Sequence, residues 1–125
     1  MMTPRDRVLQ AIAFHSTDRV PRDLAGMRST GISAFAYPRL VQALGLPPRP
    51  PRVYDTFQML ALPETDVLDA LGCDVITVCE GVTNAFDEPE KWRPYDFNGR
   101  LPALVRREET FVTRPDGTII NNARQ

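Results

Sequence analysis

The side chains in this sequence that could hold a ligand are mainly arginines. Fourteen of the fifteen basic residues are Arg, and Lys91 is the only Lys. A planar guanidinium can donate two parallel hydrogen bonds to a carboxylate, so arginine suits ligands that carry carboxylates. Sixteen acidic residues leave a net charge of −1. That balance argues against nucleic acid as a partner, because binding to phosphates needs a surplus of positive charge.

The cysteines and the histidine do not form a metal-binding pattern. Five residues separate Cys73 from Cys79, whereas zinc motifs usually leave two to four between paired cysteines. The single histidine, His15, lies far upstream of both. We therefore predict no metal site and interpret the two cysteines as small buried hydrophobic residues.

Length and composition are typical of one globular domain. The chain has 125 residues, of which 42% are hydrophobic and 25% are charged, within the usual range for such domains. No window approaches the roughly 18 consecutive apolar residues of a membrane span. The start of the chain has no apolar run of signal-peptide length. We therefore expect a cytoplasmic protein without membrane contact.

Capping and spacing signals predict four helices. Thr3 can cap a helix that has Pro4 in its first position and Asp6 in its first turn. Apolar residues at helical spacing predict the other helices. Pro38 predicts a kink or a new start within one of them, and Gly72 is suited to end the last. The predicted helices cover residues 4–15, 31–44, 54–62 and 64–71.

The strand signals indicate an α/β protein. Residues 74–78 (DVITV) form a β-branched run that predicts one buried strand, and residues 20–25 are a second candidate. The turn sequence RPDGT at residues 114–118 predicts a β-hairpin over residues 109–121. A parallel sheet of two strands would leave both edges open. We therefore expect the amino-terminal piece of a longer α/β protein.

Three segments resemble the uroporphyrinogen decarboxylase superfamily. Residues 3–9 (TPRDRVL) and 18–21 (DRVP) are similar to the family's opening helix and its entry into the first strand. Residues 68–78 (LDALGCDVITV) resemble its passage from a helix through Gly-x-Asp into a strand. The resemblance extends to about residue 80. It implies that residues 1–125 are a partial domain, the amino-terminal portion of a (β/α)₈ TIM barrel with a β-hairpin near its C-terminus. Such barrels usually need about 250 residues.

The resemblance also implies an arginine in the site. Residues 26–31 (GMRSTG) are similar to the family's Met-Arg-Gln-Ala-Gly-Arg segment, which implies a catalytic and substrate-binding role for Arg28. The segment's second Arg is not kept here, since Ile32 or Ser33 stands in its place. The loss weakens the set of arginines that a substrate with many carboxylates would need.

Three further residues are implied at the ends of the two predicted strands. Glu80 follows residues 74–78 and lies near the family's essential Asp, which implies a catalytic role. A carboxylate there could stabilise the cationic intermediate formed when a protonated pyrrole loses CO₂. Arg22 and Asp23 lie near the end of the first strand and are implied as substrate-binding residues.

The resemblance implies a decarboxylase of porphyrin biosynthesis, a lyase that needs no cofactor and acts on a tetrapyrrole. A corrinoid- or thiol-dependent methyltransferase of the same superfamily is the alternative, with a methyl donor as substrate and with zinc and corrinoid as cofactors. Residues 92–94 (WRP) and 116–117 (DG) are similar to that branch. A third reading is a non-catalytic fragment, or a module that binds through the proline-rich residues 47–51. A homodimer is compatible with either enzyme. We expect the 125 residues alone to be inactive.

Overall fold

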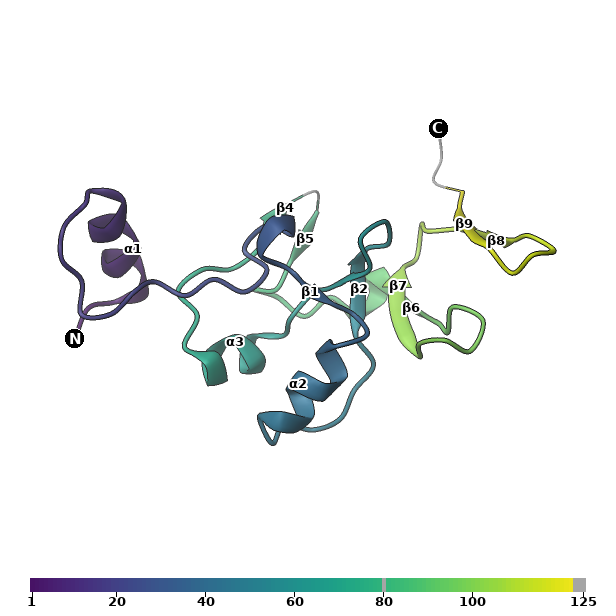
Figure 1. The fold of residues 1–125 in the computed structure, drawn as a ribbon, viewed down its shortest axis with the longest axis horizontal. Coiled ribbons are helices and arrows are strands. Elements are labelled where there is room, and N and C mark those ends of the chain that lie inside the picture. The colour runs from purple at the N-terminus through teal and green to yellow at the C-terminus, as the bar shows by residue number, and fades with distance from the viewer. Residues whose placement is uncertain (80, 123–125) are drawn as a thin grey trace.

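A mixed sheet of five short strands occupies the middle of the molecule (Figure 1). The computed structural model describes residues 1–79 and 81–122. The order across the sheet is β1-β3-β2-β7-β6, in which only β2 and β7 run parallel. The strands are β1 (Ile32–Ser33), β2 (Arg52–Asp55), β3 (Leu60–Ala61), β6 (Trp92–Tyr95) and β7 (Ala103–Arg106).

The remaining elements surround this sheet and extend from it at both ends. Helix α1 lies beside the N-terminus at one end of an elongated molecule, and the β8–β9 hairpin lies at the other (Figure 1). The helices are α1 (Pro4–Ile12), α2 (Tyr37–Ala43) and α3 (Thr65–Leu71), with 3₁₀ turns η1 (Arg28–Thr30) and η2 (Pro89–Lys91). Two separate antiparallel pairs are β4 (Val78–Cys79) with β5 (Val82–Thr83), and β8 (Phe111–Thr113) with β9 (Ile119–Asn121).

Side chains pack on both faces of the sheet, because successive strand residues point to opposite sides. All four residues of β2 are buried. Val53 belongs to the larger apolar cluster, which includes Tyr37 and Val41 of α2 and Val67 of α3. Its neighbour Tyr54 belongs to a second cluster. The other members of that second cluster are Leu60, Leu62, Val82 and Trp92.

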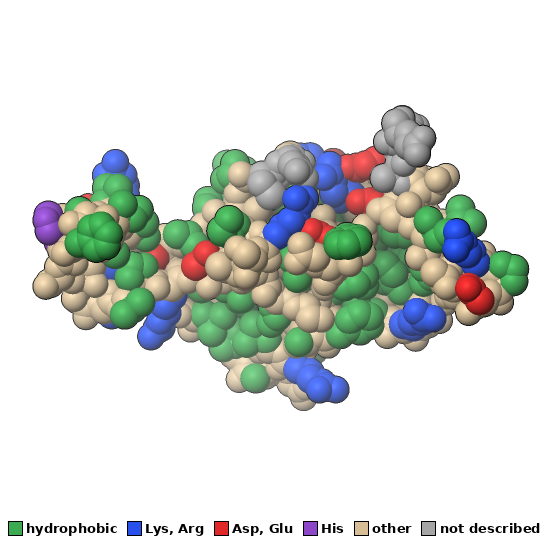
Figure 2. All heavy atoms as spheres, turned by 45° about the horizontal axis from the view of Figure 1, so that its top comes forward, with side chains coloured by type: hydrophobic (Ala, Val, Ile, Leu, Met, Phe, Trp, Pro, Cys, Tyr) green, Lys and Arg blue, Asp and Glu red, His purple; other side chains and the backbone are tan. Residues whose placement is uncertain are grey.

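The elongated shape exposes more surface than a compact chain would. The accessible area is 8124 Å², whereas a compact monomer of 14.1 kDa is expected to expose about 6,700 Å². Figure 2 shows hydrophobic side chains spread across the central part of one face. Among the described residues, no helix has both the length and the apolar character needed to cross a membrane.

The predicted portion of a (β/α)₈ barrel is wrong. A barrel strand pairs in parallel with its neighbours and is followed by a crossover helix, but three of the four pairings in the central sheet are antiparallel. Residues 20–25 form no strand, and only Val78 of residues 74–78 belongs to one. Ile76 is 50% exposed and Val78 is 76% exposed. The β-branched run therefore marks an extended segment without being buried.

The predicted helix over residues 54–62 is also wrong, since these residues form most of the β2–β3 hairpin. Asp55 explains the difference. Its Oδ1 accepts hydrogen bonds from the amides of Phe57, at 3.0 Å, and Gln58, at 2.8 Å. A side chain that bonds to nearby amides in this way favours a turn over a helix. Met59 follows with a positive φ of 54°, which completes the reversal.

Elements with strong local signals are confirmed. Thr3 caps α1 by accepting a hydrogen bond from the Asp6 amide at 3.1 Å. Gly72 ends α3 with a left-handed φ of 62°. The helix predicted over residues 31–44 is shorter than expected and begins at Tyr37, directly before Pro38. The predicted hairpin is present as β8–β9, where the Arg114 amide bonds to the carbonyl of Thr118 at 2.9 Å.

A buried carboxylate joins α1 to the rest of the molecule. The side chain of Asp74 is fully buried and accepts hydrogen bonds from Arg7, from Arg19 Nη1 at 2.7 Å and from the Arg22 amide at 2.8 Å. Arg7 also donates from Nε to Asp18 at 2.6 Å. Burial by itself would raise the pKa of the Asp74 carboxyl, but the hydrogen bonds from Arg19, Arg22 and Arg7 outweigh it and lower the pKa to about 2.

We expect Asp74→Asn to lower the free energy of unfolding at pH 7 by about 3 kcal/mol, because it leaves two buried or half-buried guanidinium groups without their shared carboxylate. Asp69→Asn, at an exposed position of α3, is the control and should change the free energy of unfolding by less than about 0.5 kcal/mol.

The effect of Asp74 should depend on pH. A carboxyl with a lowered pKa stabilises the fold at pH values above its ordinary pKa of 3.8, and that contribution is lost as the pH falls toward 2. Urea titrations of both variants and the parent should therefore show the Asp74 effect shrinking between pH 4 and pH 2. An effect of constant size from pH 5 to pH 2 would contradict this account.

Candidate functional site

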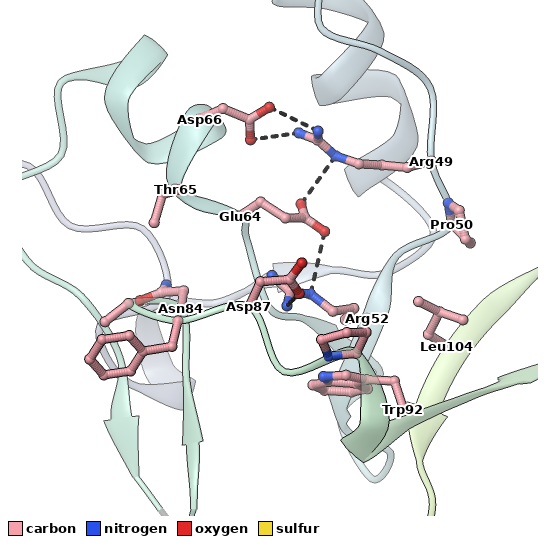
Figure 3. Close-up of a pocket in the computed structure, with 13 residues that line it drawn as sticks. Arg49, Pro50, Arg52, Glu64, Thr65, Asp66, Asn84, Asp87, Trp92 and Leu104 are labelled. Atoms are coloured by element: carbon pink, nitrogen blue, oxygen red, sulfur yellow. Dashed lines mark hydrogen bonds and ion pairs between the residues drawn. The ribbon is translucent and has the colours of Figure 1, made fainter.

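A cavity of about 660 Å³, called the Arg52 cavity below, lies between three segments of the chain (Figure 3). One segment runs from Arg49 to Arg52, the second is the start of α3 at Glu64, and the third runs from Asn84 to Trp92. A volume of this size is usual for sites that bind small molecules.

Arg52 is the buried cation of this cavity. Its side chain is 9% exposed, and its guanidinium carbon lies 5.7 Å from the centre of the Trp92 ring. Nε is 3.4 Å from Glu64 Oε1 and Nη1 is 3.7 Å from Asp87 Oδ1. The Nε atom is buried and has no hydrogen-bond partner among the residues that the structure describes.

Glu64 occupies the centre of the charged cluster. Its carboxylate accepts a hydrogen bond from the hydroxyl of Tyr37 and lies 3.3 Å from Arg49 Nε, as well as facing Arg52. Burial raises the pKa of the Tyr37 hydroxyl, and the hydrogen bond to Glu64 raises it further. Tyr37 therefore remains a neutral donor, and the Glu64 charge is shared among three partners.

Arg49 is already matched by an acid. It donates two hydrogen bonds to Asp66, from Nη1 at 2.8 Å and from Nη2 at 2.7 Å. This paired arrangement lowers the pKa of the Asp66 carboxyl, mainly through the hydrogen bonds from Arg49. The two Nη groups of Arg49 are therefore paired with Asp66, whereas its Nε, like the Nε of Arg52, is buried without a hydrogen-bond partner among the described residues.

Asn84 supplies a second donor without a partner. The residue is 3% exposed, and its Oδ1 accepts a hydrogen bond from the Thr77 amide at 3.0 Å. This bond leaves the Nδ2 amide group buried and without a hydrogen-bond partner among the described residues. Trp92 and Leu104 supply apolar surface beside these donors. The cavity therefore offers unused donors next to an aromatic wall, which suits a ligand with a carboxylate and a flat apolar part.

The described site residues that were predicted from the sequence lie outside the Arg52 cavity. The Nε of Arg28 is 2.9 Å from Asp55 Oδ2, and Arg28 lines a different, polar cavity of about 380 Å³. Arg22 donates from Nη1 to the carbonyl of Leu71 at 2.9 Å. Asp23 accepts a hydrogen bond from the Gly26 amide at 2.7 Å. None of these three lines the Arg52 cavity. Glu80 lies outside the described residues.

Sequence reasoning missed the residues that form the Arg52 cavity. The sequence pattern did not indicate Arg52, because the residues that follow it have the spacing of a helix. In the structure these residues continue β2, in which Arg52 is buried. The available signals were the sole tryptophan, Trp92, and two arginines, Arg49 within the proline-rich residues 47–51 and Arg52 directly after them. The unpartnered amide of Asn84 had no signal, because it depends on a contact with Thr77.

The described residues contain no group of three or more His, Cys, Asp or Glu side chains that could hold a metal ion. Comparisons with protein-family models, with curated proteins and with solved structures found no match for this chain. The resemblance to the uroporphyrinogen decarboxylase superfamily therefore stays a prediction.

We expect Tyr37→Phe to lower the free energy of unfolding by about 2 kcal/mol, because it removes a hydrogen bond to a charged partner and leaves the Glu64 amide without its acceptor. Tyr95→Phe is the matched control, since it keeps the stacking on Phe111 and should change the free energy by less than about 0.5 kcal/mol. Urea denaturation followed by circular dichroism measures both. Equal effects of the two substitutions would show that the Tyr37 hydroxyl does not stabilise the cluster.

Proposed function

We propose that this chain belongs to a uroporphyrinogen decarboxylase-like protein and binds a carboxylate arm of its substrate in the Arg52 cavity. The observation that carries the proposal is the buried side chain of Arg52, which lines the cavity and whose Nε has no hydrogen-bond partner among the described residues. A buried charge is costly unless hydrogen bonds compensate it. A ligand carboxylate could supply two such bonds.

The surroundings of Arg52 suit a pyrrole that carries carboxylates. Asp87 is the nearest acid on the open side, at 3.7 Å, and its side chain is 85% exposed. A ligand carboxylate can displace it into solvent at little cost. The Nδ2 group of Asn84 would then donate to a second oxygen, while the ring lies against Trp92 and Leu104. A whole tetrapyrrole is larger than the cavity, so one ring with its arms would enter.

The sequence resemblance supports the choice of substrate. The similar segments at residues 3–9, 18–21 and 68–78 belong to a superfamily whose substrate carries many carboxylates. Glu64 and Asp66 are held by arginines, so the two carboxylates at the start of α3 are already paired. The proposal therefore assigns substrate binding to the Arg52 cavity, and leaves decarboxylation to the residues that the resemblance implies.

Porphobilinogen, a single pyrrole with two carboxylate arms, is a suitable probe for the cavity. Trp92 is the only tryptophan and lines the cavity, so its fluorescence reports binding directly. We expect Arg52→Gln to weaken porphobilinogen binding by about 30-fold, because it removes a buried charge partner. Asp87→Asn should strengthen binding by about threefold, since it removes a competing surface carboxylate.

Arg39→Gln, at an exposed position of α2, is the control for general charge. Circular dichroism checks that each variant is folded. Asp87→Asn changes an exposed side chain, so it tests the proposal even if Arg52→Gln does not fold. Binding that is equal in all variants, or that leaves Trp92 fluorescence unchanged, would overturn the assignment of the ligand to this cavity.

The decarboxylase part of the proposal has its own test. If Arg28 and Glu80 have the roles that the resemblance implies, Arg28→Ala and Glu80→Ala should each slow uroporphyrinogen turnover by the complete protein by about tenfold or more. The rate of carboxyl loss is measured by separating the products by chromatography. Unchanged rates in both variants would remove these residues from the site without affecting the binding result at Arg52.

A further inference from the structure

A second cavity, of about 390 Å³, lies between the central sheet and the β8–β9 hairpin. Its lining includes Met59 after β2, Phe97 and Arg100 from the segment after β6, and Ile119 and Asn121 from β9. None of its lining residues belongs to the Arg52 cavity. It is referred to below as the hairpin cavity.

The walls of the hairpin cavity are aromatic and continuous with the core. Phe97 is 6% exposed and belongs to the larger apolar cluster, against which Phe111 and Ile119 pack. The rings of Phe97 and Phe111 are 5.7 Å apart at 63°, and Tyr95 stacks on Phe111 at 4.4 Å. Aromatic rings prefer such offset or edge-to-face neighbours. A flat ring of a ligand would extend this arrangement.

Asn121 places an unused acceptor at the cavity. Its Nδ2 group donates to Thr56 Oγ1 at 2.8 Å and to the carboxylate of Glu109. Because a carboxylate only accepts, these bonds identify which end of the amide is Nδ2. The Oδ1 atom is then buried without a hydrogen-bond partner among the described residues. A ligand N–H or O–H group would satisfy it.

Arg100 gives the hairpin cavity a positive edge. Its side chain is exposed, and its Nη2 donates a long hydrogen bond of 3.5 Å to the carbonyl of Gly117. No acidic side chain among the described residues forms an ion pair with it. An anionic group on a ligand would therefore meet an uncompensated charge.

We propose that the hairpin cavity binds a small aromatic carboxylic acid that also carries a hydrogen-bond donor. The ring lies against Phe97 and Phe111, the carboxylate pairs with Arg100, and the donor bonds to Asn121 Oδ1. Phe111, Ile119 and Asn121 belong to the hairpin. The site therefore exists only while the hairpin is packed on the sheet.

Indole-3-acetate is the probe, since it has a flat ring, a carboxylate and one N–H group. The methyl NMR signals of Met59 and Ile119, both of which line the cavity, report where it binds. We expect these signals to shift on titration. Naphthalene-1-acetate, which lacks the N–H group, and tryptamine, which replaces the carboxylate with a cation, should each bind about tenfold more weakly.

Substitutions separate the contribution of Arg100 to ligand binding from that of Asn121. Arg100→Gln should weaken indole-3-acetate binding about tenfold and leave tryptamine no weaker than in the parent, whereas the control Arg114→Gln, in the hairpin turn, should change neither. Asn121→Ala should abolish the preference for the indole over the naphthalene. Asp87→Asn, an exposed change at the first cavity, should leave indole-3-acetate binding unchanged, which makes this result independent of that cavity.

Two results would overturn the proposal. One is that the Met59 and Ile119 signals do not respond to indole-3-acetate. The other is that Arg100→Gln and Arg114→Gln affect its binding equally. Arg100 is exposed, so neither outcome can be attributed to failure of the variant to fold.

Discussion

Two opposite charges lie inside β2, a strand whose four residues are all buried. Arg52 and Asp55 cannot remain buried without partners, because an isolated charge in an apolar interior is strongly unfavourable. Asp55 is compensated by Arg28 and by the amides of its own turn. Among the described residues, Arg52 is compensated by ion pairs of 3.4 Å and 3.7 Å and by the Trp92 ring, whose centre is 5.7 Å from its guanidinium carbon. Asp55 therefore completes a turn, whereas the buried Nε of Arg52 is left without a hydrogen-bond partner among the described residues.

Long-range ion pairs hold α1 at one end of the elongated molecule. Helix α1 buries little apolar surface of its own, since Leu9 is 46% exposed and Ile12 is 69% exposed. Arg7 is the residue of this helix that is buried, and it reaches Asp74 together with Arg19. The helix is thus held to the body by a charge cluster rather than by a shared apolar core. Its attachment should be more sensitive to acid than the packing of the sheet.

The two cavities lie beside different apolar clusters. Trp92 and Leu104 border the Arg52 cavity and belong to the cluster that contains Tyr54. Phe97 borders the hairpin cavity and belongs to the cluster that contains Val53. Since Val53 and Tyr54 are neighbours in β2, they point to opposite faces of the sheet. One short strand therefore separates two sites that could be occupied independently.

The sequence by itself determined the elements whose signals are local. The Thr3 cap, the end of α3 at Gly72 and the β8–β9 turn each depend on residues within a few positions of one another. Only the tertiary structure decided that residues 74–78 are partly exposed and that β2 lies in a mixed sheet instead of a barrel. Only the tertiary structure also brought Arg52, Glu64 and Asn84 together at one cavity. The physical reason is that strand pairing and charge compensation join residues far apart in the chain, and local spacing carries no information about which distant partner each residue will meet.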